Sequence, residues 1–113
     1  MKVVVIVLND LDYMDDVLEA FVRLGVKGAT ILDSHGMGKA LRDSKTLNYL
    51  MKGTIDRKIP EEVHDSKTIF SVIPDNEDAD FLIKTIENLL NFSSSDSIGF
   101  VFSLPVASIN PIK

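Results

Sequence analysis

The sequence predicts an α+β fold, a ferredoxin-like βαββαβ sandwich in which two helices cover one face of a four-stranded antiparallel sheet. Two observations support this class. Apolar residues follow strand spacing and helix spacing in the order strand, helix, strand, strand, helix, strand along the 113 residues. Two right-handed crossover units of this kind pack as such a sandwich. A connection of 33 residues, 34–66, separates the two units, whereas connections of about 4 to 6 residues are usual, and a loop this long inside a compact domain is usually functional.

The first unit begins with six consecutive aliphatic residues, 3–8, which predict a strand buried on both faces and central in its sheet. Asp12 is expected to cap a helix over 13–24 that Gly25 ends, and the second strand follows over 28–33. The helix is expected to pack on the sheet through apolar side chains at helical spacing, namely Met14, Val17, Leu18, Phe21 and Leu24.

The second unit repeats this order. Alternating residues over 67–73 predict a third strand, and Asp75 or Asn76 is expected to cap the helix that follows. The fourth strand is predicted over 97–104. The apolar face of the second helix is predicted to consist of Ala79, Leu82, Ile83, Ile86, Leu89 and Leu90.

Composition narrows the class of protein. A chain of 113 residues with 45% hydrophobic and 26% charged residues is expected to fold as one domain over 1–113. The absence of cysteine excludes disulfides, thiol nucleophiles and zinc–thiolate sites, and it fits a reducing compartment. No apolar run approaches the roughly 20 residues of a membrane span, and the N-terminus lacks the features of a signal peptide, so a cytoplasmic protein without membrane insertion is expected. The net charge of −5 argues against nucleic acid as a partner.

One face of the predicted sheet is left without helices. The strand 3–8 offers aliphatic side chains to both faces, and either Ile69 or Phe70 continues the uncovered face on the neighbouring strand. An uncovered apolar face predicts an interface, so an obligate oligomer is expected; the alternative is that the connection 34–66 folds back over this face. Three residues of the last strand also share one face, namely Phe100, Phe102 and Leu104.

The connection 34–66 is basic, although the rest of the chain is acidic. Residues 35–58 carry a net charge of +4, which leaves −9 for the remainder. An anionic ligand or an acidic partner surface would be attracted to this segment, and the alternative is a solvated loop. Lys39 is the leading candidate because it follows a glycine turn, and a short helix is expected over 45–52. The candidate residues for contact with a partner are Arg42, Lys45, Tyr49, Lys52, Arg57 and Lys58.

Two turns carry candidate binding groups. Gly36, Met37 and Gly38 permit close approach of the backbone, so they either line a ligand cleft or only release the chain from the second strand. Ser94 and Ser95, in the turn before the last strand, offer hydroxyls and amides to a polar ligand, or they form a plain turn.

The two histidines stand at opposite ends of the connection. His35 follows Asp33 and His64 precedes Asp65, so both imidazoles would bind a transition metal if the ends of the connection converge. The alternative is an ordinary or pH-sensitive surface role. The sequence offers no activated nucleophile and no substrate pocket for acid–base catalysis by these histidines, so the chain is not expected to be an enzyme.

Four short segments match the sequence pattern of a known protein family. They are 18–28 (LEAFVRLGVKG), 29–30 (AT), the turn 36–38 (GMG) and 98–106 (IGFVFSLPV). Together they resemble the PII-like nitrogen regulatory signalling proteins. The resemblance implies a homotrimer with the sheets facing inward, sites for nucleotides and small metabolites in the clefts between subunits, and a long loop that docks onto a target transporter or enzyme. It also places the first nucleotide contacts at Thr30, Gly36, Met37, Gly38 and Lys39.

The sequence departs from this family pattern at the phosphate contacts. The segment 93–96 (SSSD) stands where the family has a glycine-rich turn that ends in lysine, and 106–113 has only its terminal lysine where the family has arginines. The pattern around the modified tyrosine of the family is missing at Tyr49. An adenine nucleotide would therefore bind here with most phosphate contacts absent, and the ligand is expected to be a different molecule or none. The alternatives are a metal-responsive ferredoxin-like trimer and a ligand-free interaction module.

Overall fold

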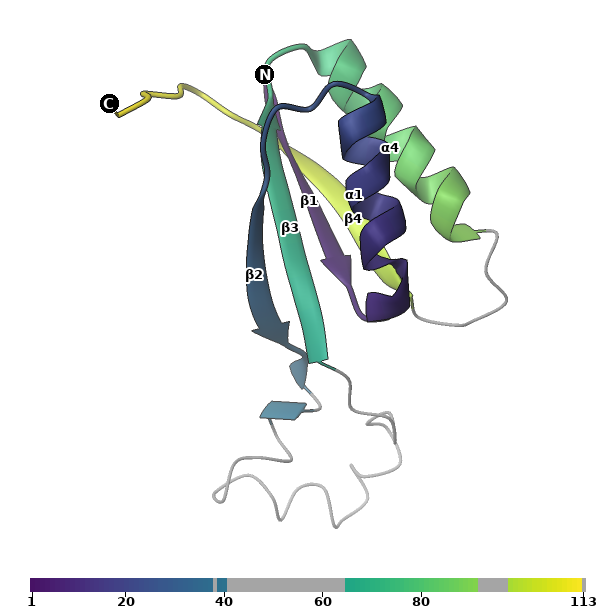
Figure 1. The fold of residues 1–113 in the computed structure, drawn as a ribbon. Helices are drawn as coiled ribbons and strands as arrows, with labels where there is room; N and C mark the ends of the chain where they lie inside the picture. The colour runs from purple at the N-terminus through teal and green to yellow at the C-terminus, as the bar shows by residue number, and fades with distance from the viewer. Residues whose placement is uncertain (38, 41–64, 92–97, 113) are drawn as a thin grey trace.

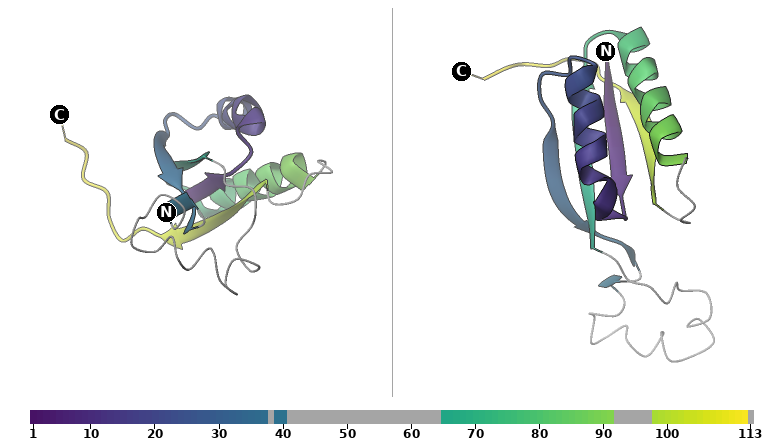
Figure 2. Two further views of the ribbon diagram at one scale, coloured as in Figure 1. Left: turned by 90° about the horizontal axis from the view of Figure 1, so that it is seen from below. Right: turned by 45° about the vertical axis from the view of Figure 1, so that its right-hand side comes forward.

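The sheet is antiparallel throughout, with the strand order β2-β3-β1-β4. The computed structural model describes residues 1–37, 39–40, 65–91 and 98–112. Both long helices lie on the same face of the sheet (Figure 1), and the view from below in Figure 2 shows the two layers. This arrangement confirms the predicted ferredoxin-like α+β fold. The elements are β1 (Lys2–Leu8), the short helix η1 (Leu11–Tyr13), α1 (Met14–Arg23), β2 (Thr30–His35), β3 (Asp65–Ile73), α4 (Asn76–Asn91) and β4 (Gly99–Pro105).

The core lies between the sheet and the two helices. Val4, Ile6 and Leu8 of β1 are fully buried because alternate residues of this central strand face the helices. Isoleucines of β3 and the apolar stripes of α1 and α4 complete the core. The predicted packing face of α4 is confirmed, and that of α1 is confirmed except that Ala20, and not Leu18, belongs to the core cluster. Within the described ranges, no helix is long and apolar enough to cross a membrane.

Aspartates cap the N-termini of η1 and α4, whereas α1 begins after Tyr13 without a side-chain cap. The predicted cap at Asp12 is wrong: the carboxylate of Asp10 accepts a hydrogen bond from the Asp12 amide at 3.1 Å and so begins η1 one short turn before α1. Asp75 is the cap of α4, because its carboxylate accepts bonds from the amides of Glu77 and Asp78 at 2.7 and 3.2 Å.

The strands on either side of the long connection extend further than the sequence predicts. β2 begins at Thr30 and continues to His35, and β3 begins at Asp65, so two further residue pairs extend the ladder beyond its predicted end. The side chains of these last pairs interact through serine hydroxyls and charged groups. Hydrophobic periodicity cannot predict strand residues of this kind. The Ala40 amide then donates to the Gly36 carbonyl at 3.1 Å, so the chain turns into a helical conformation directly after β2. The predicted helix over 45–52 and turn over 93–96 lie outside the described residues.

Candidate functional site

A polar hollow of about 350 Å³ lies where the chain leaves β2 and returns into β3. The ends of the two strands and the first turn after β2 supply most of its side chains. Leu11, at the start of η1, contributes an apolar wall. The lining residues are Leu11, Asp33, Ser34, His35, Lys39, Asp65, Ser66 and Lys67.

Two ion pairs join the strands across this hollow. Lys67 Nζ donates to Asp33 Oδ1 at 2.7 Å, and the two residues face each other directly in the β2–β3 register. Lys39, in the turn after β2, pairs with Asp65 at the start of β3. The hydrogen bond and charge of Lys67 lower the pKa of Asp33, and those of Lys39 lower the pKa of Asp65. Both carboxylates are therefore held in their charged form.

His35 lies beside Asp65, not beside the acid that precedes it in the sequence. The two residues are paired in the ladder, and His35 Nδ1 is 3.8 Å from Asp65 Oδ1. Asp33 is occupied by Lys67, and His64 lies outside the described residues. No group of three or more His, Cys, Asp or Glu side chains suited to hold a metal ion is found in the described part of the chain.

A row of hydroxyl groups crosses the same strand ends on the sheet face opposite the helices. The hydroxyls of Ser34 and Ser66 are 2.7 Å apart, and Thr68 Oγ1 donates to Ser34 Oγ at 3.0 Å. Ser66 is buried although it is polar, and this pairing satisfies it. Hydrogen bonds and ion pairs thus join β2 and β3 at the base of the connection.

The structure brings only some of the predicted binding residues to this hollow. Lys39 lines it, whereas Gly36 and Met37 follow the end of β2, with Met37 76% exposed. Thr30 lies at the other end of β2, five positions from His35 and about 16 Å away at the usual rise of a strand. The predicted residues outside the described ranges are Gly38, Arg42, Lys45, Tyr49, Lys52, Arg57, Lys58, His64, Ser94 and Ser95.

Sequence reasoning missed the partners of the charged residues. The sequence assigns Lys67 only to a strand and Ser66 only to the connection, and it links Asp33 and Asp65 only to their histidine neighbours in the chain. The register between β2 and β3 decides these pairs, and no spacing within the sequence encodes that register.

The arrangement supports two kinds of chemistry. An anionic ligand with a carboxylate, carbonate or phosphate group would compete with Asp65 for the ammonium group of Lys39. A cation would instead compete with Lys39 for Asp65, with His35 as a second donor. Either ligand would change the ion pair that ties the first turn after β2 to the start of β3.

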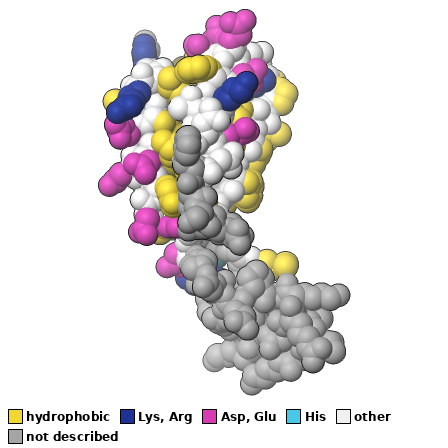
Figure 3. Space-filling view, turned by 90° about the vertical axis from the view of Figure 1, so that its right-hand side faces the viewer, with side chains coloured by type: hydrophobic (Ala, Val, Ile, Leu, Met, Phe, Trp, Pro, Cys, Tyr) yellow, Lys and Arg dark blue, Asp and Glu magenta, His cyan; other side chains and the backbone are white. Residues whose placement is uncertain are grey.

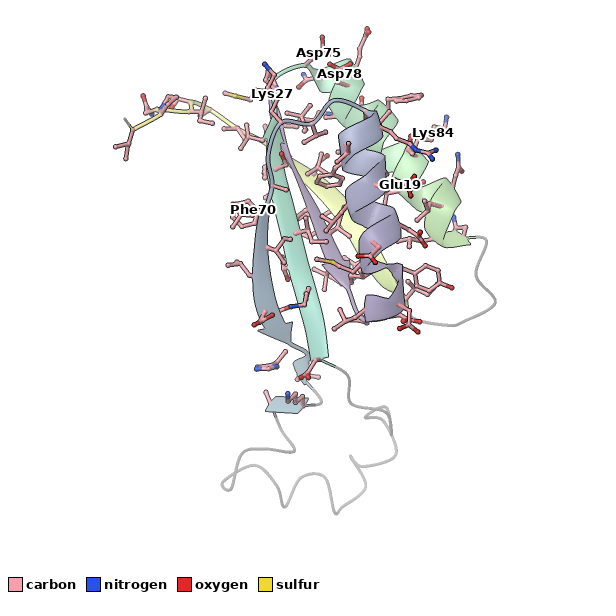
Figure 4. All side chains as sticks on the ribbon, in the orientation of Figure 1. Glu19, Lys27, Phe70, Asp75, Asp78 and Lys84 are labelled. Atoms are coloured by element: carbon pink, nitrogen blue, oxygen red, sulfur yellow. The ribbon has the colours of Figure 1, made fainter. Side chains whose placement is uncertain are left out.

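The uncovered sheet face is a second candidate surface. Val5 of β1 lies between Phe70 of β3 and Phe102 of β4 in the register, so all three point away from the helices, as Figure 4 shows for Phe70. Of the two residues that the sequence offers for this face, Phe70 therefore belongs to it, because Ile69 is buried on the helix side. The rings of Phe100 and Phe102 are stacked, with centroids 6.1 Å apart. Phe100, Phe102 and Leu104 are 56%, 39% and 53% exposed.

Comparisons with known proteins agree with this architecture. The profile of a family described as nitrogen regulatory protein P-II matches residues 1–113. No curated protein sequence matches the chain.

Two solved structures are similar to the chain in fold. One is CPII, a nitrogen regulatory PII-like protein from Thiomonas intermedia bound to ADP, AMP and bicarbonate, with 20% identity, a TM-score of 0.62, and 98% of this chain and 94% of that chain covered. Another is Arabidopsis thaliana PII bound to citrate, with 17% identity, a TM-score of 0.62, and 93% of this chain and 76% of that chain covered. At these identities the likeness concerns the fold.

Proposed function

Because the chain belongs to the nitrogen regulatory protein P-II family, we propose that it is a cytoplasmic regulatory protein and not an enzyme. It binds a small anionic ligand at the base of the connection 34–66 and contacts a target protein, a transporter or an enzyme, through that connection. The single observation that carries the proposal is the pairing of Lys39 with Asp65, because this cation lies where the connection leaves the sheet.

The ligand is placed along β2, which is an edge strand of the sheet. All of its residues except Ser34 are exposed. Thr30 at one end of the strand and the turn 36–39 at the other are too far apart for one compact metabolite, so an elongated ligand such as a nucleotide would use both ends. A bicarbonate or small carboxylate would use the Lys39 end alone. These classes include the molecules bound to the similar solved structures, which are ADP, AMP and bicarbonate in one and citrate in the other.

The active form is proposed to be a homotrimer closed through the uncovered sheet faces. The exposed phenylalanines of β4 and the valines of β1 are the apolar surface that this assembly would bury. Ligand clefts would then lie between subunits, where Ser94 and Ser95 of one subunit join the ligand site of another.

The ligand is proposed to act on the connection through Asp65. When an anion takes Lys39, Asp65 loses the ammonium group that is hydrogen-bonded to it, so the tie across the base of the connection weakens. Among the described residues, His35 and Lys67 remain close enough to act on its charge. Segments held by few contacts lie at the low-stability end of a fold, where modest binding energy shifts their populations. The bound and free forms would thus present 34–66 differently to the target.

The test is thermal unfolding in the presence of ATP, ADP, AMP, 2-oxoglutarate, citrate, bicarbonate and divalent metals, each tested singly at high excess. A ligand at 100 times its dissociation constant adds about 2.7 kcal/mol of stability, on the order of ten degrees for a domain of this size. We expect a shift with at least one anion, and no shift with that anion in Lys39→Gln.

Lys27→Gln is the matched control, because Lys27 is exposed and lies outside the hollow. An equal shift in Lys39→Gln and Lys27→Gln would place the ligand elsewhere. A flat response to the whole panel would contradict the ligand site and leave a ligand-free interaction module. A shift with a divalent metal alone, abolished by His35→Ala, would establish the metal-responsive alternative.

A further inference from the structure

The outer surface of the helix layer contains a groove between α1 and α4. The two helices pack side by side and run in opposite directions (Figures 1 and 2). The groove has a volume of about 250 Å³. Its lining is apolar along the middle and charged at the edges, and consists of Asp16, Glu19, Ala20, Arg23, Leu24, Phe81, Thr85 and Leu89.

Phe81 is the largest apolar side chain of this groove and is poorly covered. It is 61% exposed, whereas the next residue, Leu82, is 1% exposed and packs in the core. Consecutive residues of a helix point about 100° apart, so Leu82 takes the position toward the sheet and Phe81 faces outward. Thr85, one turn later, donates its hydroxyl to the Phe81 carbonyl at 2.8 Å. Single exposed apolar residues are common, but Phe81 continues the apolar strip that Ala20, Leu24 and Leu89 form.

The helices that border the groove are strongly acidic. Together α1 and α4 carry seven carboxylates and only two cations, Arg23 and Lys84. Arg23 is already held by Glu19 of its own helix at 2.6 Å. Figure 3 shows acidic side chains around apolar ones on the α4 side of the molecule, and Figure 4 shows Glu19 and Lys84 on the outside of the helix layer. Such a surface repels nucleic acid and anionic lipid and attracts a basic partner.

We propose that the groove docks a basic amphipathic helix of a partner protein. A third helix fits between two packed helices because its ridge of side chains enters their groove. Its apolar face would lie against Phe81 and Leu89. Its lysines or arginines would face Asp16 and would compete with Arg23 for Glu19. The groove is on the opposite side of the sheet from the surface proposed for the trimer, so both are available at once. This site does not depend on the connection 34–66 or on its ligand.

The test uses a fluorescein-labelled peptide of about 18 residues, with leucines at i, i+3, i+4 and i+7 and lysines elsewhere. Fluorescence anisotropy at about 0.15 M salt measures its binding to the whole protein. We expect Phe81→Ser and Asp16→Lys each to weaken binding at least about tenfold. Both residues are exposed, and circular dichroism with thermal unfolding confirms that each variant is folded.

Val22→Ser is the matched control. Val22 is 76% exposed on α1 but does not line the groove, so its replacement should leave binding unchanged. A peptide of the same composition in scrambled order, which lacks an apolar face, should bind at least about tenfold more weakly.

Three results would overturn the proposal. The first is the absence of binding, and the second is equal binding by the scrambled peptide or by all variants, which would reduce the effect to bulk charge. The third is peptide binding that survives Phe81→Ser but is lost in Phe102→Lys, because that result would place the peptide on the uncovered sheet face.

Discussion

At the scale of single residues, the base of the connection is organised by pairs that cross from one strand to the next. Lys67 holds Asp33, and Lys39 holds Asp65. All four groups are at least partly exposed to water, so each pair contributes little to overall stability and is weakened by salt. Their position matters more than their energy, because they determine which charges the proposed ligand at Lys39 would have to displace.

Replacing Lys67 with glutamine tests the pairing with Asp33. The pKa of Asp33 lies below its ordinary value of 3.8 because Lys67 donates a hydrogen bond to it and adds a positive charge. In Lys67→Gln the pKa should rise toward 3.8, as measured by NMR titration of the carboxyl carbon.

The sign of the accompanying pH effect follows from linkage. A lowered pKa in the folded state stabilises the protein above the unfolded-state pKa, and this contribution disappears as the pH falls through the folded-state pKa. The free energy of unfolding of Lys67→Gln should therefore depend less on pH than that of the wild type, between the unfolded-state pKa and the folded-state pKa of Asp33. Lys27→Gln is the control, and an unchanged Asp33 titration in Lys67→Gln would contradict the pairing.

At the scale of elements, the start of β4 is defined by a backbone approach that only glycine permits. Gly99 lies opposite Leu8 in the register, and the carbonyl of Ile98 accepts the amides of Asn9 and Asp10 at 2.7 and 3.2 Å. A Cβ atom added to Gly99 would lie 2.2 Å from the carbonyl oxygen of Val7. The end of β1 and the start of β4 are thus held together where η1 begins.

Gly99→Ala should destabilise the protein by about 1–3 kcal/mol, the range typical of overpacking, because the clash involves the backbone of the central strand. The free energy of unfolding in urea measures the change. Gly28→Ala is a matched control, since a Cβ atom at Gly28 meets nothing within 4 Å. Equal stabilities of the two variants would show that the approach at Gly99 is not a constraint.

At the scale of the whole molecule, three surfaces of different chemistry are separated in space. The helix layer is acidic with an apolar groove, the opposite sheet face is apolar, and the base of the connection carries paired charges. This separation would allow the proposed self-assembly, ligand binding and contact with a partner to proceed on different faces.

Phe102→Lys should dissociate the proposed trimer, because a charge on the sheet face would be buried without a partner in the assembly. Sedimentation velocity of wild type and variant measures the change in mass. Val22→Lys, a substitution at an exposed site on the helix layer, should leave the mass unchanged. A monomeric wild type, or a variant with wild-type mass, would contradict assembly through this face.

The sequence by itself determined the fold class, the order of the elements and their buried faces. These properties are local, because the alternation of apolar residues in strands and their recurrence in helices follow from backbone geometry alone. The uncovered apolar face was predictable for the same reason. The capping residues were less predictable. Asp10 and Asp12 both carry a side chain that can cap the first helix, as Asp75 and Asn76 do for α4, and only the backbone path selects one of each pair.

Only the tertiary structure decided which polar residues meet. The sequence places Asp33 two positions from His35, yet the register pairs Asp33 with Lys67 and His35 with Asp65. The structure also sets the distance between two predicted contacts, since Thr30 begins β2 and Lys39 lies in the turn after its other end. Hydrogen bonds across strands and the length of an extended chain set these relations, and neither is encoded in residues that are neighbours along the chain.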